Sequence, residues 1–240
     1  MPQRAYDMFM SAFNDIEAHL KGSLYGGRDG APGFRRMLDE FKRKHARKLR
    51  QRQYDELILL SELRNTLTHG QRLNNYPLAE PTGAAVAAIR RLRNEVLNPP
   101  MVLAMLKRDK PVTASPDESV RRVLDVMYEN DFSQVPVYEG DVYQGLLTTN
   151  TVARWVADQV RRHEGLAEDA PVRDVLKFSE RTDDVKHVAR TVTTTEAIWR
   201  FTTAAESGQP LTALIITEHG SLHESPLGIV VAEDLARLSS

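Results

Sequence analysis

The sequence contains no cysteine, which excludes disulfide bonds, zinc–thiolate sites and cysteine nucleophiles. It has no run approaching the roughly 20 apolar residues of a membrane-spanning helix, and its start, MPQRAYDMFMSAF, predicts an amphipathic helix and not a signal peptide. The signatures GxxxxGK[ST], GxGxxG, HExxH and GxSxG are also absent. We therefore expect a cytoplasmic protein with no membrane contact, no metal site and no required cofactor.

Charge is distributed unevenly along the chain. Residues 1–100 contain 17 Lys and Arg against 11 Asp and Glu, whereas the remainder contains 15 against 22. This asymmetry predicts two domains with different partners, and RNA is a candidate partner for the basic one. The run KRKHARKLRQR at 42–52 holds seven of these 17 cationic residues. It could attract RNA phosphates, or it could equally be a solvated junction between helices.

The first hundred residues show only helical periodicity. Apolar residues recur at helical spacing from Tyr6 to Leu20, and Gly22 and Gly26–Gly27 interrupt that pattern. The other predicted helices lie at about 33–44, 48–69 and 82–97, and a loop is predicted at 71–81. Four helices with short links predict an antiparallel bundle over residues 1–100.

The pattern changes after Pro99–Pro100. Short β-branched runs such as VPVY, LIIT and GIVV alternate with helical segments, which predicts an α/β domain over residues 101–240. This part contains an internal repeat, because TASPDESVRRV at 113–123 aligns without gaps on TVTTTEAIWRF at 191–201. Each copy places a hydroxyl three residues before a glutamate (Ser115 with Glu118, Thr193 with Glu196), the spacing of a capping box that opens a helix.

The two copies include SQVPVYEG at 133–140, GLLTTNTV at 145–152 and GIVVAEDL at 228–235. On these segments the repeated unit resembles the CBS motif, and the two copies together resemble a CBS pair (Bateman module). The resemblance covers about Lys110–Ser240, with one motif at about 110–165 and the other at about 185–240. It implies a regulatory module that binds an adenine nucleotide (AMP, ATP or S-adenosylmethionine) between the two motifs.

The resemblance also implies a set of binding residues. In the family, the threonine of G-h-h-T meets phosphate, and an aspartate three residues later holds the ribose hydroxyls, which suits the acceptor capacity of a carboxylate. The first copy has Thr148 but Thr151 in place of the aspartate, and the second has Asp234 but Val231 in place of the hydroxyl. The predicted nucleotide-binding residues are Thr113, Val135, Pro136, Thr148, Thr191 and Asp234. The alternative is a CBS pair that serves only folding and dimerisation.

A cation lies on the apolar side of the third predicted helix. At about 100° per residue, Arg64 falls within the arc formed by Leu57, Leu60 and Leu67. A guanidinium placed there needs an anion, a subunit interface or a cleft. His69 follows one residue before Gly70, which is predicted to stop the helix.

The segment RNTLTH, with Arg64, Asn65 and His69, resembles the R-x4-6-H motif of the HEPN family. That resemblance covers residues 1–100 and implies a dimeric, metal-independent endoribonuclease. His69 would be the general acid or base, Arg64 would stabilise charge developing on phosphate, and Asn65 would position the phosphate. Without that activity, Arg64 would be a structural arginine and His69 a cation at the helix end.

Together these features predict a homodimer with two domains: a HEPN-like helical bundle and a CBS pair that responds to a nucleotide. The first hypothesis for its function is an RNA-cleaving enzyme whose dimer geometry depends on the ligand. The alternative is a non-enzymatic regulator or adaptor, in which the CBS pair senses an adenine nucleotide and the helical domain mediates dimerisation or binds a partner.

Overall fold

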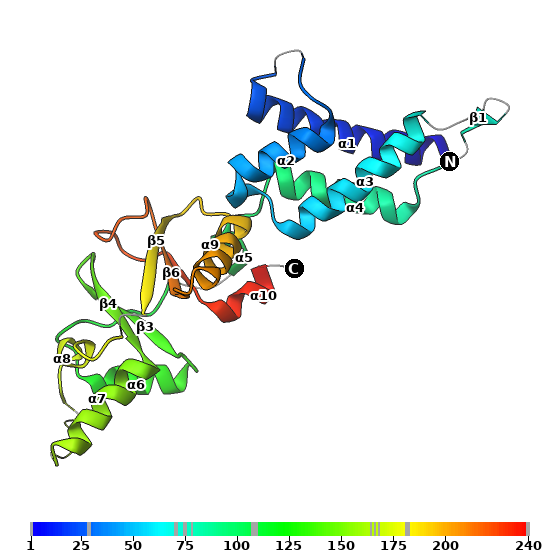
Figure 1. Ribbon diagram of the computed structural model, residues 1–240. Helices are drawn as coiled ribbons and strands as arrows, with labels where there is room; N and C mark the ends of the chain where they lie inside the picture. Colours follow the sequence, from blue (N-terminus) through cyan, green and yellow to red (C-terminus); the bar gives the residue numbers. More distant parts are fainter. Residues whose placement is uncertain are drawn as a thin grey trace. The chain divides into compact units, whose positions relative to one another are not determined.

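The computed structural model describes residues 2–27, 30–69, 72–73, 76–77, 79–106, 110–163, 165, 167, 169–180 and 183–238. The chain forms two compact units, Met1–Pro100 and Met101–Ser240 (Figure 1). In the described residues the first unit is helical apart from one pair of very short strands, and the second is α/β. The predicted order of a helical region followed by an α/β region is confirmed. None of the described helices is long and apolar enough to cross a membrane.

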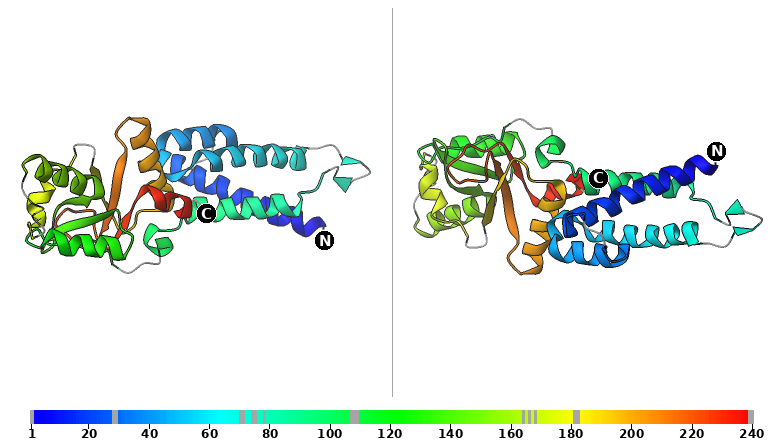
Figure 2. Two further views of the ribbon diagram at one scale, coloured as in Figure 1. Left: turned by 90° about the horizontal axis from the view of Figure 1, so that it is seen from below. Right: turned by 90° about the horizontal axis from the view of Figure 1, so that it is seen from above.

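The helices of the first unit lie alongside one another (Figure 2). They are α1 Pro2–Tyr25, α2 Phe34–Lys44, the 3₁₀ helix η1 Ala46–Lys48, α3 Gln51–His69 and α4 Gly83–Leu97. The basic run at 42–52 therefore crosses three elements and is not one continuous helix. Between α3 and α4, β1 (Arg72–Leu73) and β2 (Tyr76–Pro77) pair antiparallel in the segment predicted to be a loop. Strands of two residues are too short to produce a detectable alternation.

Helix α1 continues through Gly22 to Tyr25, so the predicted interruption at Gly22 is wrong. A glycine in a helix costs only about 1 kcal/mol relative to alanine. Leu24 and Tyr25 pack partly against the core, and the Tyr25 hydroxyl donates a hydrogen bond to Glu40 of α2. These contacts offset the cost of Gly22. The helix ends where Gly26 takes a left-handed φ of +61°.

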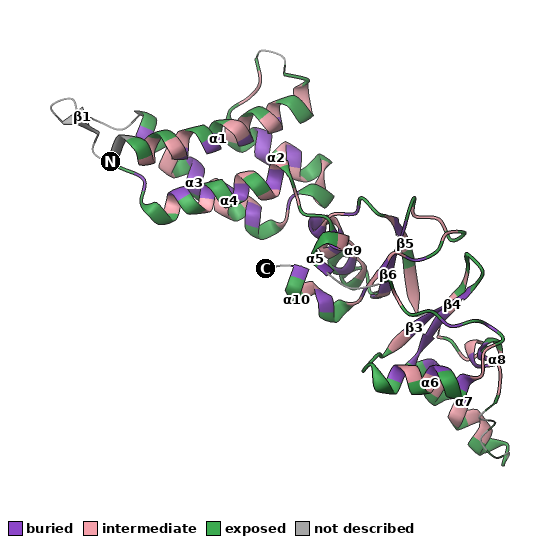
Figure 3. Cartoon of the chain, turned by 180° about the vertical axis from the view of Figure 1, so that it is seen from behind, coloured by how far each residue is buried: buried purple, intermediate pink, exposed green. Residues whose placement is uncertain are grey.

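The core of the first unit lies between its helices (Figure 3). In α1 the fully buried residues Phe9, Phe13, Ile16 and Leu20 recur every three or four positions, as expected for one face of a helix. Their partners from the other helices include Leu38, Phe41, Leu57, Ile89 and Leu92. Burying each of these side chains stabilises the unit by about 1.5–3 kcal/mol.

The second unit contains two sheets with helices packed against them. Its elements are α5 Val102–Leu106, α6 Val120–Glu129, β3 Gln134–Glu139, β4 Val142–Thr148, α7 Thr149–Arg161, α8 Val172–Leu176, β5 Asp184–Ala189, α9 Thr194–Glu206, β6 Leu211–Thr217, β7 Gly228–Val230, the 3₁₀ helix η2 Ala232–Asp234 and α10 Leu235–Leu238. In the first repeat, helices α6 and α7 contact strands β3 and β4, and in the second α9 contacts β6.

The two sheets repeat one arrangement. Strands β3 and β4 pair antiparallel, and Ala114 adds a parallel bridge to Val137. In the second repeat β5 pairs parallel with β6, and β7 pairs antiparallel with the other edge of β6. The segment around Ala114 thus occupies in the first repeat the place that β5 occupies in the second.

Only one of the two predicted capping boxes opens a helix. Thr193 Oγ1 accepts a hydrogen bond from the Glu196 amide at 3.2 Å, and α9 begins at Thr194. Ser115 and Glu118 instead close a turn, in which the Glu118 carboxylate accepts from the Ser115 amide at 3.1 Å. Helix α6 begins only at Val120. The prediction that Ser115 opens the helix is wrong, because the same spacing also satisfies an isolated turn.

Each repeat completes its core with a helix that lies outside its own sequence. Val102 and Leu106 of α5 pack with Val188, Val230 and Leu238 of the second repeat. The Val102 amide also donates to the Val192 carbonyl at 3.0 Å. Conversely, α8, which follows the first repeat, packs Val172 and Val175 into that repeat's core together with Trp155.

Candidate ligand-binding cavity

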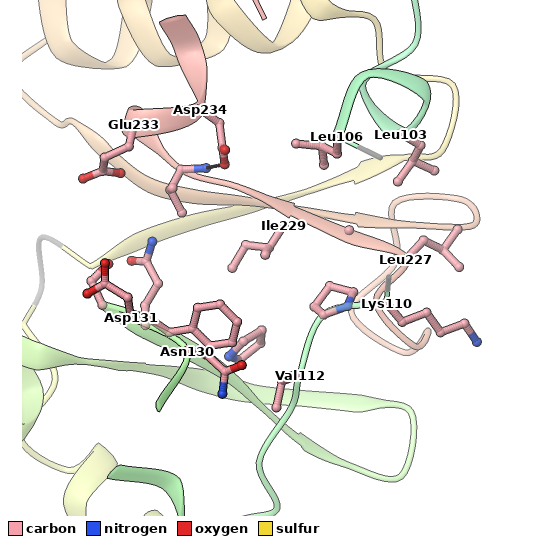
Figure 4. A pocket seen from close by; sticks show the side chains of 17 residues that line it. Leu103, Leu106, Lys110, Val112, Asn130, Asp131, Leu227, Ile229, Glu233 and Asp234 are labelled. Carbon is pink, nitrogen blue, oxygen red and sulfur yellow. Dashed lines mark hydrogen bonds between the residues drawn. The ribbon is translucent and has the colours of Figure 1, made fainter. Parts of the chain in front are cut away.

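A cavity of about 760 Å³ lies within the second unit and is lined by residues of both repeats (Figure 4). Its volume falls within the range that small-molecule sites occupy. The apolar part of the wall comes from α5, from the segment before Ala114, from the turn after α6, and from β7 with the residue before it. Its members include Leu103, Leu106, Val112, Phe132, Leu227 and Ile229.

Strand β7 begins with a glycine, Gly228, that lines the cavity. A Cβ at Gly228 would come within 2.8 Å of Leu103 Cδ2 and 3.5 Å of Leu106 Cδ1. A larger residue there would force the Leu103 side chain, which lines the cavity, to shift. The backbone of β7 therefore forms part of the wall directly.

Carboxylates gather at one end of the cavity. Asp131, from the turn after α6, and Glu233, from η2, lie on opposite walls at that end, and Asp234 lies beside Glu233 (Figure 4). Among the described residues, neither Asp131 nor Glu233 forms an ion pair. Lys110 lines the opposite end (Figure 4). Sequence reasoning missed Asp131, Glu233 and Lys110, although Glu233 directly precedes Asp234 in the motif.

Asp234 is buried, with 3% of its surface exposed. Its Oδ2 accepts a hydrogen bond from the Val231 amide at 3.2 Å, so the carboxylate caps the short helix η2. One oxygen is thereby used in holding the turn. The carboxylate nevertheless borders the cavity, where it can also accept from a bound hydroxyl.

The structure disperses the predicted nucleotide-binding residues. Pro136 and Asp234, from different repeats, both line the cavity. Thr113 is exposed and follows Val112, which lines it, whereas Val135 is buried in the core of the first repeat. Thr191 is exposed and Thr148 is buried, and neither lines this cavity.

Thr148 takes part in a separate polar cluster at the start of α7. Its Oγ1 accepts from the Thr151 amide at 3.1 Å and lies 2.9 Å from Thr151 Oγ1. Thr151 Oγ1 in turn donates to Asp183 Oδ2 at 3.5 Å. A carboxylate thus lies near the position where the first motif lacks its aspartate, but it comes from the segment before β5.

A partly buried aromatic cluster in the same unit was not predicted. The Tyr143 ring lies 5.5 Å from that of Tyr138 and 4.7 Å from that of His187, both edge-on. The Tyr138 hydroxyl and His187 Nε2 are buried without a hydrogen-bond partner among the described residues. Burial raises the pKa of Tyr138 to about 12 and lowers the pKa of His187. Three single residues on three strands leave no motif in the sequence.

In the first unit, Arg64 lies against the core as its place on the helix predicted. Its guanidinium carbon is 5.7 Å from the centre of the Phe13 ring, and its Nη1 donates to Asn65 Oδ1 at 3.3 Å. Its Nε is buried without a hydrogen-bond partner among the described residues. The side chain of His69 lies outside the described residues, so the pairing of His69 with Arg64 stays a prediction.

Comparison with known proteins identifies part of the second unit. The family model described as "CBS domain" matches residues 104–158. No curated protein matches the chain.

Three of the solved structures that this chain resembles cover 58–65% of it, at 14–20% sequence identity. A CBS-domain-containing protein, ATU1752 from Agrobacterium tumefaciens, is 20% identical, with 58% of this chain and 93% of that chain covered and a TM-score of 0.43. The CBS domain of a membrane protein from Sphaerobacter thermophilus is 18% identical, with 65% and 97% covered and a TM-score of 0.45. The CBS domain pair of protein MJ0100, in complex with 5′-methylthioadenosine and S-adenosyl-L-methionine, is 14% identical, with 59% and 96% covered and a TM-score of 0.42. By its sequence match, the segment 104–158 is a CBS domain.

Proposed function

We propose that the second unit is a regulatory CBS pair that binds an adenosine-containing ligand in the cavity between its repeats. The observation that carries the proposal is the cavity itself, which is lined by Pro136 of one repeat and Asp234 of the other. These are two of the residues that the CBS resemblance assigns to nucleotide binding. The apolar walls suit a flat base, and the Asp234 carboxylate suits ribose hydroxyls.

A ligand in this cavity would act on the arrangement of the two repeats. The turn after α6 belongs to the first repeat, whereas β7 and η2 belong to the second. A ligand that contacts both favours whichever arrangement binds it more tightly. The regulatory function therefore follows from shared contacts, and needs no catalytic group in this unit. The helical unit would then supply dimerisation or partner binding.

The test is binding of adenosine to the full-length protein, measured by calorimetry and by the shift in Tm. We expect saturable binding by wild type and an approximately tenfold weaker affinity for Asp234→Asn, because the amide keeps the acceptor for the Val231 amide but loses the charge. Asp125→Asn is the control, since Asp125 is exposed on α6 and does not line the cavity. Absence of heat and of a thermal shift at millimolar adenosine would contradict the proposal, as would equal affinities for Asp234→Asn and wild type.

A further inference from the structure

The loop between β6 and β7 in the second repeat is longer than its counterpart in the first. It consists of residues 218–227, whereas Gly140 and Asp141 alone join β3 to β4. The first repeat shows that a two-residue turn is enough to connect such strands. The extra residues of the β6–β7 loop can therefore make contacts elsewhere.

A glutamate organises the β6–β7 loop from within. The Glu224 carboxylate accepts hydrogen bonds from the His219 amide at 2.8 Å and from the Ser221 amide at 3.3 Å, and it pairs with the His219 ring at 2.7 Å. The amide and the ring of His219 lower the pKa of Glu224 to about 2. The loop thus has a charged centre that holds its backbone in one conformation.

The loop backbone lies directly on β5 of its own repeat. His219 forms an antiparallel bridge with Ala189, the last residue of β5. A Cβ at Gly220 would lie 3.0 Å from the Ala189 nitrogen, and Gly220 has a left-handed φ of +84°. Both features require glycine at this position. The loop is therefore anchored to the second repeat at its start.

The middle of the loop contacts the hairpin of the first repeat. The Tyr143 amide of β4 donates to the Leu222 carbonyl at 2.9 Å, and the Ser225 hydroxyl donates to the Asp141 carboxylate in the turn of the hairpin. At the same junction the Tyr143 ring packs against that of His187 of β5. The β6–β7 loop thus links the two repeats through hydrogen bonds from backbone and side chain.

The end of the loop forms part of the cavity wall. Its last residue, Leu227, lines the cavity next to Gly228 of β7 (Figure 4). The Leu227 amide donates to the Ile216 carbonyl of β6 at 2.7 Å. Between Ser225, which contacts the hairpin, and Leu227 lies the buried Pro226, whose ring restricts the backbone. A displacement of Ser225 is therefore transmitted to the cavity wall.

We propose that the β6–β7 loop is a strap that ties the hairpin of the first repeat to the second repeat, and that closure of the strap and occupancy of the cavity stabilise each other. An occupant that contacts Leu227 favours the closed strap if it binds that arrangement more tightly, and the closed strap then raises its affinity by the same factor. The coupling rests on the proposed function, whereas the strap itself requires no ligand.

Amide hydrogen exchange of the full-length protein, followed by NMR, tests the strap without a ligand. Ser225→Ala removes the contact with Asp141, and Glu224→Ala removes the centre of the loop. We expect the amides of Tyr143 and Leu227 to exchange on the order of tenfold faster in both variants, because a hydrogen bond that stabilises the closed strap is lost. Both amides keep their own carbonyl acceptors, so faster exchange reports opening of the loop.

A third variant and a distant amide are the controls. Glu218→Ala changes a carboxylate of the same loop that pairs with the exposed Arg190 side chain, and it should leave Tyr143 exchange within about twofold of wild type. The Val120 amide of the first repeat donates to the Ala170 carbonyl at 2.9 Å, and it should exchange at the wild-type rate in every variant. Unchanged Tyr143 exchange in both strap variants, or an equal acceleration at Val120, would overturn the strap.

Adenosine tests the coupling. Saturating adenosine should slow exchange at the Tyr143 amide of wild type about threefold, although Tyr143 does not line the cavity. The effect should disappear in Ser225→Ala. If adenosine binds and leaves Tyr143 exchange unchanged, the coupling is wrong while the proposed function stands. If adenosine does not bind, the proposed function and the coupling both fail, and the exchange measured without ligand still decides the strap.

Discussion

His187 illustrates how one half-buried side chain can affect the stability of the second unit. Its ring packs edge-on against Tyr143, and its Nε2 lies out of contact with solvent. Burial opposes protonation and lowers the pKa of the imidazole below its ordinary value of about 6.5. The unfolded chain, in which the imidazole is hydrated, takes up the proton at a higher pH than the folded protein does.

We predict that stability falls as the pH drops below about 6.5, because protons then bind preferentially to the unfolded state. The contribution of the neutral His187 to the free energy of unfolding is fully present above that pH. Urea unfolding of wild type and His187→Phe at pH 8 and pH 5 measures how this free energy depends on pH. The phenylalanine keeps the edge-on ring contact, so the variant should lose less stability between the two pH values. Equal losses in the two proteins would show that His187 does not carry this dependence.

At the scale of elements, the sequence predicted the long helices better than the sites. Helices α2, α3 and α4 lie within about three residues of their predicted bounds, because each buries one face and so repeats its apolar residues at about 3.6-residue spacing. The cavity could not be predicted in this way. Its walls come from turns and strand ends such as Asp131 and Gly228, which are far apart in the chain and are brought together only by the pairing of the repeats.

The role of α5 was also missed, because a helix of five residues has too few apolar positions to show a partner. Its sequence precedes the first repeat, yet Val102 is fully buried in the core of the second. Sequence order alone therefore gives no sign that α5 packs with the second repeat.

We predict that Val102→Ala lowers the free energy of unfolding by about 2 kcal/mol, through lost burial and the space left behind. Met105→Ala is the matched control on the same helix. Met105 is 39% exposed, and its replacement should change stability by less than about 0.5 kcal/mol. Urea unfolding followed by circular dichroism measures both. A loss at Met105 as large as that at Val102 would mean that α5 does not pack as described.

At the scale of the whole molecule, the two units have separate cores. Among the described residues, the core of the first unit draws on residues before Pro100, and both cores of the second draw on residues after it. A unit that buries its own apolar side chains has what it needs to fold alone.

We therefore predict that a fragment spanning 101–240 unfolds cooperatively in urea. A fragment spanning 110–240 keeps both repeats of the sequence but lacks α5, so the second repeat loses Val102 and Leu106 from its core. It should unfold at a clearly lower urea concentration, or fail to fold. Equal stability of the two fragments would contradict the packing of α5 into the core of the second repeat.

The packing of α5 with the second repeat also has a consequence for synthesis on the ribosome. Helix α5 is translated long before β5, β6 and β7, so its apolar side chains stay exposed until the strands that cover them have been made. The core of the first repeat is completed sooner, because α8 follows that repeat closely in the chain. Val102 and Leu106 are thus the residues of this unit that remain exposed longest in the nascent chain, and a chaperone that binds short apolar segments would find them there.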